Sequence, residues 1–233
     1  MIELFAQTLQ HHDRSADTCV ADNGICPSWI ADNFDRYVGP FWHHVYLTLV
    51  SVAIGFAIAF VLALLAHRRR WLTGPIVQVT GILYTLPSVA VFFLLLPLTG
   101  RGDTTAIIAL VAYSLLILFR NFIAGFENVP VETRDAGRGM GLTQRQLLWK
   151  VELPLALPEI MAGLRIAVTT TVGLTSLAFL AGAGGLGEAL FDDITFRSNV
   201  LVAGGLAVLL AVVLDLTILV VQKAMTPWTR AAA

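Results

Sequence analysis

Charged residues are scarce in this chain. Asp, Glu, Lys and Arg make up 13% of its 233 residues, against about 25% in soluble domains. The net charge is only −1, so the chain has no overall positive field that would attract nucleic acid. Hydrophobic residues instead reach 57%, and the mean hydropathy is +0.77. This composition excludes an ordinary soluble domain and predicts a protein embedded in a lipid bilayer.

Motifs of catalysis and nucleotide binding are missing as well. The sequence has no Gly-x-x-x-x-Gly-Lys-[Ser/Thr] segment, which excludes ATP binding by a P-loop. The nearest spacing, "GAGGLG", is followed by Glu188 in place of the required lysine. The apolar runs contain neither a Ser–His–Asp set nor a pattern of metal ligands. We therefore expect a protein that is not an enzyme, with no catalytic residue, no metal site and no cofactor of its own.

Long apolar runs recur along the chain, and a membrane-spanning helix needs about 20 mainly apolar residues. The runs predict helices at about 43–66, 74–98, 104–125, 158–182 and 201–222. Too little polar sequence remains to cover these helices in a soluble core. The expected fold class is all-α, a polytopic membrane protein with about five transmembrane helices in one domain over residues 41–228.

Lys and Arg residues accumulate on the cytoplasmic side of membrane helices. In this chain they concentrate in the loop at 68–70, in a polar insert at 127–157 and in the C-terminal tail. This distribution predicts a cytoplasmic insert, a cytoplasmic C-terminus and an N-terminus outside the cell membrane.

Residues 1–40 are polar and lack the basic start and apolar core of a signal peptide. We expect them to form an extracytoplasmic segment that the first helix carries across the membrane. Both cysteines of the chain, Cys19 and Cys26, lie in this segment. An oxidising compartment permits a disulfide between them, and the "DNG" sequence between them can supply a turn. The alternative is two free thiols in a mobile tail.

The insert at 127–157 carries local signals for two short helices outside the bilayer. Asn128 can cap the N-terminus of the first helix, and Pro130 suits its first turn. Gly141 is expected to end that helix, because glycine adopts the left-handed conformation freely.

The second helix of the insert should begin at the capping-box pattern of Thr143 and Gln146. Pro154 is expected to end this helix, and Pro158 to open the next spanning helix. Small residues at 136–141 would let another surface approach the first helix closely. The insert is therefore either a docking element for a partner or a long solvated loop.

The sequence "DAG" at 135–137 is followed after three residues by Gly141, and after nine more by "VELP" at 151–154. This pattern resembles the EAA motif of ABC-importer permeases, which reads E-A-A, three residues, G, nine residues, then I-x-L-P. In that family the loop forms a coupling helix that docks on the ATP-binding subunit. The resemblance implies an ATPase-coupling role for Glu132, Asp135, Ala136, Gly137, Gly141, Leu153 and Pro154.

From about Val45 to Thr226 the sequence is similar to permeases for quaternary-amine osmoprotectants, such as glycine betaine, carnitine and choline. Segments such as "YTLPSVAVFFLLLPLTGRGDTT" and "AGAGGLGEAL" carry this similarity. The resemblance implies a type I ABC importer permease core in the plasma (inner) membrane of a prokaryote. It also implies partners: ABC ATP-binding subunits that use ATP and Mg, a substrate-binding protein, and a second permease copy or a paralogue.

Residues that would line a substrate path are marked less clearly. Pro87 interrupts the second expected helix, where Tyr84 and Ser88 could face a path or form part of a packed kink. Asp215 lies within the fifth expected helix, where an acidic residue is a functional candidate by default. It could attract a quaternary ammonium group, hold a helix pair together or reach the inner interface.

Two other functions fit parts of this sequence. An ABC permease for another small solute, such as an amino acid, would share the coupling motif. A proton-coupled secondary transporter would use Asp215 as its relay and would need no ATP. ATP dependence of transport and co-purification of an ATPase distinguish these two classes.

Overall fold

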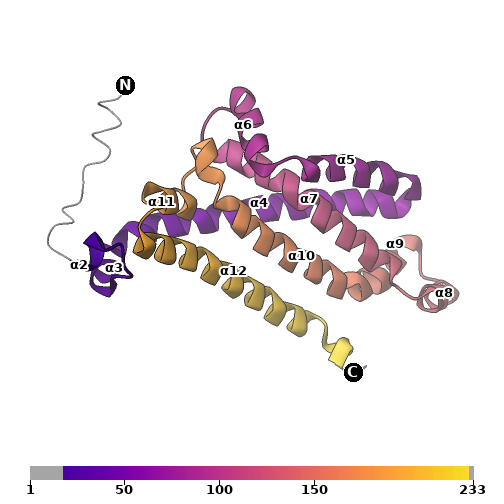
Figure 1. Ribbon diagram of the computed structural model, residues 1–233. Coiled ribbons are helices and arrows are strands. Elements are labelled where there is room, and N and C mark those ends of the chain that lie inside the picture. Colours follow the sequence, from indigo (N-terminus) through magenta and orange to yellow (C-terminus); the bar gives the residue numbers. More distant parts are fainter. Residues whose placement is uncertain (1–17, 231–233) are drawn as a thin grey trace.

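The described part of the chain, residues 18–230, is largely helical in this computed structural model, and no strand occurs in it. Figure 1 shows long helices running along one another, with short helices at both ends of the bundle. The elements in chain order are α2 (Thr18–Ala21), α3 (Pro27–Asn33), α4 (Asp35–Arg68), η1 (Arg70–Leu72), α5 (Thr73–Thr85), α6 (Ser88–Thr99), α7 (Asp103–Glu127), α8 (Val131–Gly139), α9 (Gln144–Leu147), η2 (Leu148–Glu152), α10 (Leu153–Thr175), η3 (Ala178–Ala181), α11 (Leu186–Asp192), α12 (Arg197–Met225) and η4 (Pro227–Arg230).

Three of the described helices, α4, α7 and α12, are long and apolar enough to cross a membrane. A fourth span results if α5 and α6 are counted together, because only two residues separate them. The expected helix at 158–182 corresponds to α10, which starts and ends earlier, carries Glu159 and Arg165, and is not among the three. The all-α, polytopic membrane fold that the sequence predicted is confirmed.

A single continuous helix at 74–98 is wrong, because α5 and α6 meet at a corner of 98°. Leu86 at this corner is extended, with a ψ of 137°, as expected for a residue that precedes a proline. Its carbonyl accepts a 2.5 Å hydrogen bond from the Tyr113 hydroxyl of α7. Pro87 therefore interrupts the helix as the sequence predicted, and α7 stabilises the resulting corner.

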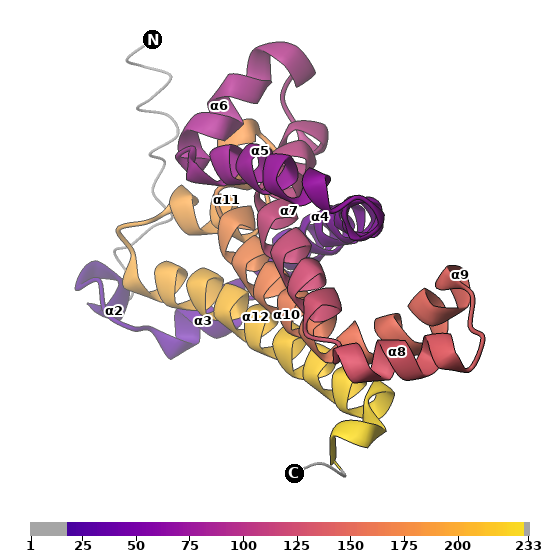
Figure 2. The ribbon, with the colours of Figure 1, turned by 90° about the vertical axis from the view of Figure 1, so that its right-hand side faces the viewer.

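α7 lies at the centre of the bundle and packs against α4 and α10, while α10 also packs against α12 (Figure 2). Phe122 of α7 is fully buried. Its ring meets Phe56 and Phe60 of α4 edge-on, with centroids 5.0 and 6.0 Å away. Such packing holds helices together where the surrounding lipid is itself apolar. α12 differs, because only 6% of its most apolar stretch is buried, which leaves its outer face to lipid or to another protein.

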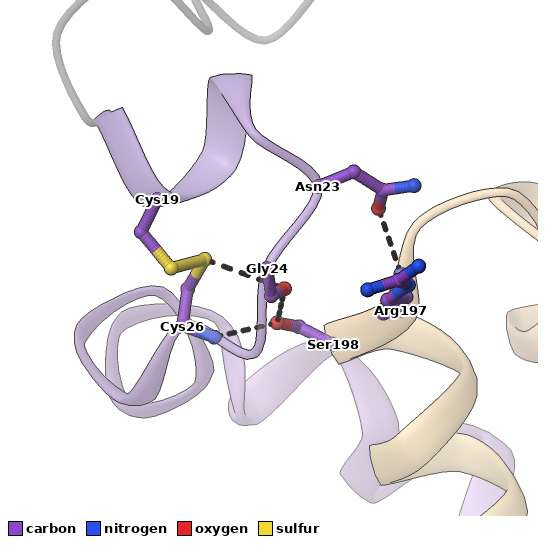
Figure 3. Close-up of a disulfide and its surroundings, with 6 residues drawn as sticks. All are labelled: Cys19, Asn23, Gly24, Cys26, Arg197 and Ser198. Carbon is purple, nitrogen blue, oxygen red and sulfur yellow. Dashed lines mark hydrogen bonds between the residues drawn. A yellow bond between two sulfur atoms is a disulfide. The ribbon is translucent and has the colours of Figure 1, made fainter.

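Residues 18–34, which we call the N-terminal module, are anchored to the start of α12 (Figure 3). A disulfide joins Cys19 to Cys26. The Ser198 hydroxyl accepts a 2.8 Å hydrogen bond from the Cys26 amide and donates a 3.0 Å hydrogen bond to the Gly24 carbonyl. The remainder of the expected extracytoplasmic segment, residues 1–17, lies outside the described residues.

Further contacts fix the N-terminal module in place. The Asn23 side chain donates a hydrogen bond to the Thr195 carbonyl and accepts one from the Arg197 amide. Just after the module, the Tyr37 hydroxyl donates a 2.6 Å hydrogen bond to the buried Asn199 side chain. The described part of the N-terminal segment is therefore folded against the bundle.

Candidate functional site

The first helix of the insert, α8, begins later than the sequence indicates. Its N-cap is Pro130, which lies just before the first turn, and no side chain caps the helix. Asn128 is instead the C-cap of α7, and its side-chain amide donates a 3.3 Å hydrogen bond to the Glu159 carboxylate. The predicted N-terminal capping by Asn128 is wrong, because this residue has the helical backbone of the last turn of α7 and a capping residue does not.

The end of α8 is confirmed as the sequence predicted it. Gly141 has a φ of +81°, and the Leu142 amide donates a 3.2 Å hydrogen bond back to the Gly137 carbonyl. This is the left-handed C-terminal turn that glycine favours. Gly137 itself is buried, and a Cβ atom there would lie 2.7 Å from Leu147 Cδ1. The missing side chain at Gly137 therefore lets α8 pack closely against α9.

The start of α9 is confirmed, but its expected end is wrong. Thr143 and Gln146 form the predicted capping box, each side chain accepting from the other residue's amide. After α9 the π-helical turn η2 leads without a break into α10, and Pro154 lies in the first turn of α10. Pro154 has no N–H to donate and lies just after the π-helical turn, where the regular helical hydrogen-bond pattern is already interrupted. Pro158, expected to open the next helix, lies inside α10.

The outer surface of α8 presents part of the predicted coupling set. Glu132, Asp135 and Ala136 are exposed. Val131 and Met140, at the two ends of this surface, are 60% and 75% exposed. We call these five residues the α8 face. It combines two carboxylates, a small residue and two apolar side chains in reach of a partner.

The other residues of the predicted coupling set lie elsewhere. Gly137 is buried against α9, and Gly141 forms the exposed turn after α8. Leu153 and Pro154 are half-buried in the first turn of α10. The predicted set therefore divides into residues on the α8 face and residues that shape the helices behind it.

A buried carboxylate that the sequence analysis did not single out lies behind α8. Glu152 is 5% exposed. Its Oε1 lies 3.0 Å from Arg134 Nε of α8, and its Oε2 lies 2.9 Å from His67 Nε2 of α4. Arg134 also donates to the Phe126 carbonyl near the end of α7. We call Glu152, Arg134 and His67 the buried junction, because these three side chains connect α8, η2 and α4.

A hollow of about 240 Å³ opens beside the buried junction. It is lined by Ala66, His67, Arg70, Thr73, Ile123, Phe126, Glu127 and Arg134. Quaternary ammonium groups are recognised by the faces of several aromatic rings, and this lining has a single phenylalanine, so it does not match such a ligand. Within residues 18–230, no three His, Cys, Asp or Glu side chains come together as a possible metal site.

Three of the predicted path residues lie together at the corner between α5 and α6. Tyr84 is 41% exposed, and its ring meets Tyr113 edge-on at a centroid distance of 6.0 Å. Pro87 is exposed, and the half-buried Ser88 begins α6. The corner thus carries an exposed tyrosine.

Asp215 lies apart from that corner, on α12, with α7 and α10 between the two (Figure 1). Arg165 of α10 binds it with two hydrogen bonds of 2.8 Å, from Nε to Oδ1 and from Nη2 to Oδ2. Such a bidentate pair is the strongest geometry that arginine forms with a carboxylate. Asp215 therefore holds a helix pair together, because it joins α12 to α10 through Arg165.

Comparisons with known proteins extend these observations. Residues 49–230 match the family described as "Binding-protein-dependent transport system inner membrane component". The chain is 36% identical to the osmoprotectant import permease protein OsmW of Salmonella typhimurium, over 85% of this chain and 96% of that protein. It is 34% identical to the choline transport system permease protein OpuBB of Bacillus subtilis, over 80% of this chain and 87% of that protein. An inward-facing structure of the MetNI methionine ABC transporter shares its fold, with a TM-score of 0.68 at 24% identity over 84% of this chain and 96% of that one.

Proposed function

This chain belongs to the family of binding-protein-dependent transport system inner membrane components, and from that premise we propose its place in a complete transporter. It is a multi-pass inner-membrane permease subunit of the ABC importer type. Permeases of this kind work with ATP-binding subunits and a substrate-binding protein. In our proposal the partner subunits bind and hydrolyse ATP with Mg, and this chain supplies the passage through the bilayer.

The proposed substrates are quaternary-amine osmoprotectants of the glycine betaine, carnitine and choline type. The observation that carries this proposal is the 36% identity to an osmoprotectant import permease, which extends over 96% of that protein. The similarity to a choline permease supports the same class. Asp215 is engaged by Arg165, so it is not a free anion that would attract the substrate. The separate binding protein is therefore the proposed main selector.

The α8 face is the proposed docking site for the ATP-binding subunit. Two of its exposed residues, Asp135 and Ala136, begin the motif "DAG", and the glycine turn at Gly141 gives the helix a defined end. Gly137, Leu153 and Pro154 act indirectly in this proposal, because they set how α8 and α10 pack. The alternative to a docking element is a long solvated loop, and such a loop would not need α8 to be held by a buried ion pair.

The proposed orientation follows from the two ends of the bundle. The N-terminal module lies at one end, and α8, α9 and the C-terminus lie towards the other (Figure 1). The arginine-rich segment at 68–70 lies at the α8 end, since the neighbouring His67 contacts Glu152. The positive-inside rule then makes the α8 end cytoplasmic and the module extracytoplasmic, where the Cys19–Cys26 disulfide is compatible with its compartment. A second permease copy or a paralogue completes the passage.

Competition for uptake tests the proposed substrate. The chain is reconstituted in proteoliposomes with its ATP-binding subunits and its binding protein, and ATP-dependent uptake of radiolabelled glycine betaine is measured. We expect uptake that excess unlabelled choline or carnitine reduces and excess methionine leaves unchanged. ATP-dependent uptake of methionine without uptake of glycine betaine would assign the permease to amino acids instead.

A further inference from the structure

We propose that Glu152 is a positioning residue that transmits displacement of α8 to α4 and α10 through Arg134 and His67. The inference rests on the proposed docking of the ATP-binding subunit on the α8 face. It adds the residues inside this chain that would carry the motion inward from that face.

The geometry of the buried junction supports this role. One carboxylate faces two basic side chains from different helices, at 3.0 Å from Arg134 Nε and 2.9 Å from His67 Nε2. The His67 ring also packs against Phe126, with centroids 4.8 Å apart. Arg134 in turn donates to the Phe126 carbonyl. Displacement of α8 therefore acts on the ends of α4 and α7 and on the start of α10 together.

The other attachments of α8 are local. The helix packs mainly against α9 and η2, and a Cβ atom at Gly137 would lie only 2.7 Å from Leu147 Cδ1 of α9. The Arg134 side chain is thus the principal polar link from α8 to the bundle, and it is only 14% exposed. A side chain in this position couples α8 to the spanning helices more directly than the packing of α8 itself.

Glu152 also lies in a stretch where the helical hydrogen-bond pattern is irregular. It is the last residue of η2, in which the Leu153 amide bonds to the Leu148 carbonyl five residues earlier. π-helical turns of this kind are rare and occur frequently at functional sites. The carboxylate thus lies between α9 and α10, at a turn whose hydrogen-bond pattern can rearrange when α9 and α10 move relative to each other.

The test uses the assembled transporter with Glu152→Gln, which keeps the size of the side chain and removes its charge. The matched control is Glu159→Gln, the same change in α10, at a carboxylate that contacts the Asn128 amide. The first readout is solute taken up per ATP hydrolysed. We expect Glu152→Gln to assemble with its partners and to lower this ratio by about twofold to thirtyfold, while the control keeps the wild-type ratio. An unchanged ratio in Glu152→Gln would overturn the proposal, because a merely structural ion pair alters stability and not coupling.

A second readout needs no substrate. Spin labels are attached at Arg145→Cys on α9 and Trp71→Cys in η1, both exposed, and report the distance between the insert and the end of α4. The native Cys19 and Cys26 do not take up label, because they are joined in a disulfide. We expect ATP to change this distance in the wild type and not in Glu152→Gln. A wild type without an ATP-dependent change, or a variant with the full change, contradicts the proposal. If the wild type changes distance but takes up none of the proposed solutes, the substrate is wrong and the junction stands.

Arg134→Lys keeps the proposal testable if Glu152→Gln does not assemble. Lysine retains a positive charge beside Glu152 but presents a single ammonium group, so it cannot serve both Glu152 and the Phe126 carbonyl in the way arginine does. We expect a smaller fall in uptake per ATP than in Glu152→Gln, with normal assembly. A wild-type ratio in Arg134→Lys would overturn the proposed role of Arg134.

Discussion

The Arg165–Asp215 pair shows how an acidic residue of a spanning helix can serve packing. Its two 2.8 Å hydrogen bonds join α10 to α12. The most apolar stretch of α12 is little buried, so this pair is a specific attachment away from the contacts that Ser198 and Asn199 make at the start of the helix. An intramembrane carboxylate is a functional candidate until its partner is known, and here the partner is an arginine on the neighbouring helix.

Asp215→Asn removes the charge and leaves the Arg165 guanidinium without its counter-ion. Breaking such a pair by removing one partner is destabilising, and replacing both partners by apolar residues is far less so. We therefore expect Asp215→Asn to lower the Tm by several degrees and to slow transport without abolishing it. Asp215→Leu combined with Arg165→Leu should recover most of the Tm. Complete loss of transport at an unchanged Tm would instead point to a proton relay.

Ser198 is the residue on which the N-terminal module depends most directly. Ser198→Ala leaves the buried Cys26 amide without its acceptor, and an unsatisfied buried donor costs about 1–3 kcal/mol. We expect faster reduction of the Cys19–Cys26 disulfide by dithiothreitol, because the module detaches more often. Thr195→Val is the control, since the exposed Thr195 hydroxyl donates to the half-buried Asp193 carboxylate two residues away and not to the module. Equal reduction rates in the two variants would show that Ser198 does not anchor the module.

At the scale of elements, some features of the insert depend on residues close together in the sequence, and others depend on contacts between distant residues. The end of α8 and the start of α9 depend on residues within five positions of one another, and both were predicted from the sequence. The end assigned to Pro154 was wrong, because the π-helical turn η2 continues into α10 and Pro154 follows it without a break in the helix. Glu152 was missed, because its partners lie 18 and 85 positions away and no spacing rule connects them.

Alanine substitutions at two glycines of the insert test two different effects: backbone strain at Gly141 and helix propensity at Gly139. Gly141→Ala places a Cβ on a residue with a φ of +81° in open space, so we expect a loss of about 1–2 kcal/mol from the backbone alone. Gly139→Ala lies in the helix, also in open space, and should stabilise α8 by up to about 1 kcal/mol. Hydrogen exchange over residues 131–147 measures both effects. Equal protection in the two variants would show that Gly141 does not define the end of α8.

At the scale of the whole molecule, α4 connects the N-terminal module to the buried junction. This helix has 34 residues and is therefore about 50 Å long. Tyr37 near its start contacts Asn199 beside the N-terminal module, and His67 near its end contacts Glu152 of the buried junction. The apolar runs predicted this bundle well, because a span is a property of local composition. The docking of the module was not predictable, because it depends on contacts across more than 170 residues.

ATP-driven import is the central claim, and the energy source of uptake tests it most directly. Proteoliposomes containing the chain, its ATP-binding subunits and its binding protein are loaded with ATP, or are given an inward proton gradient without ATP, and uptake of radiolabelled glycine betaine is followed. We predict uptake with ATP alone, and its loss when Ala136→Trp obstructs the α8 face but not when Gln144→Trp alters the exposed start of α9. Uptake driven by the proton gradient in the absence of ATP would contradict the account.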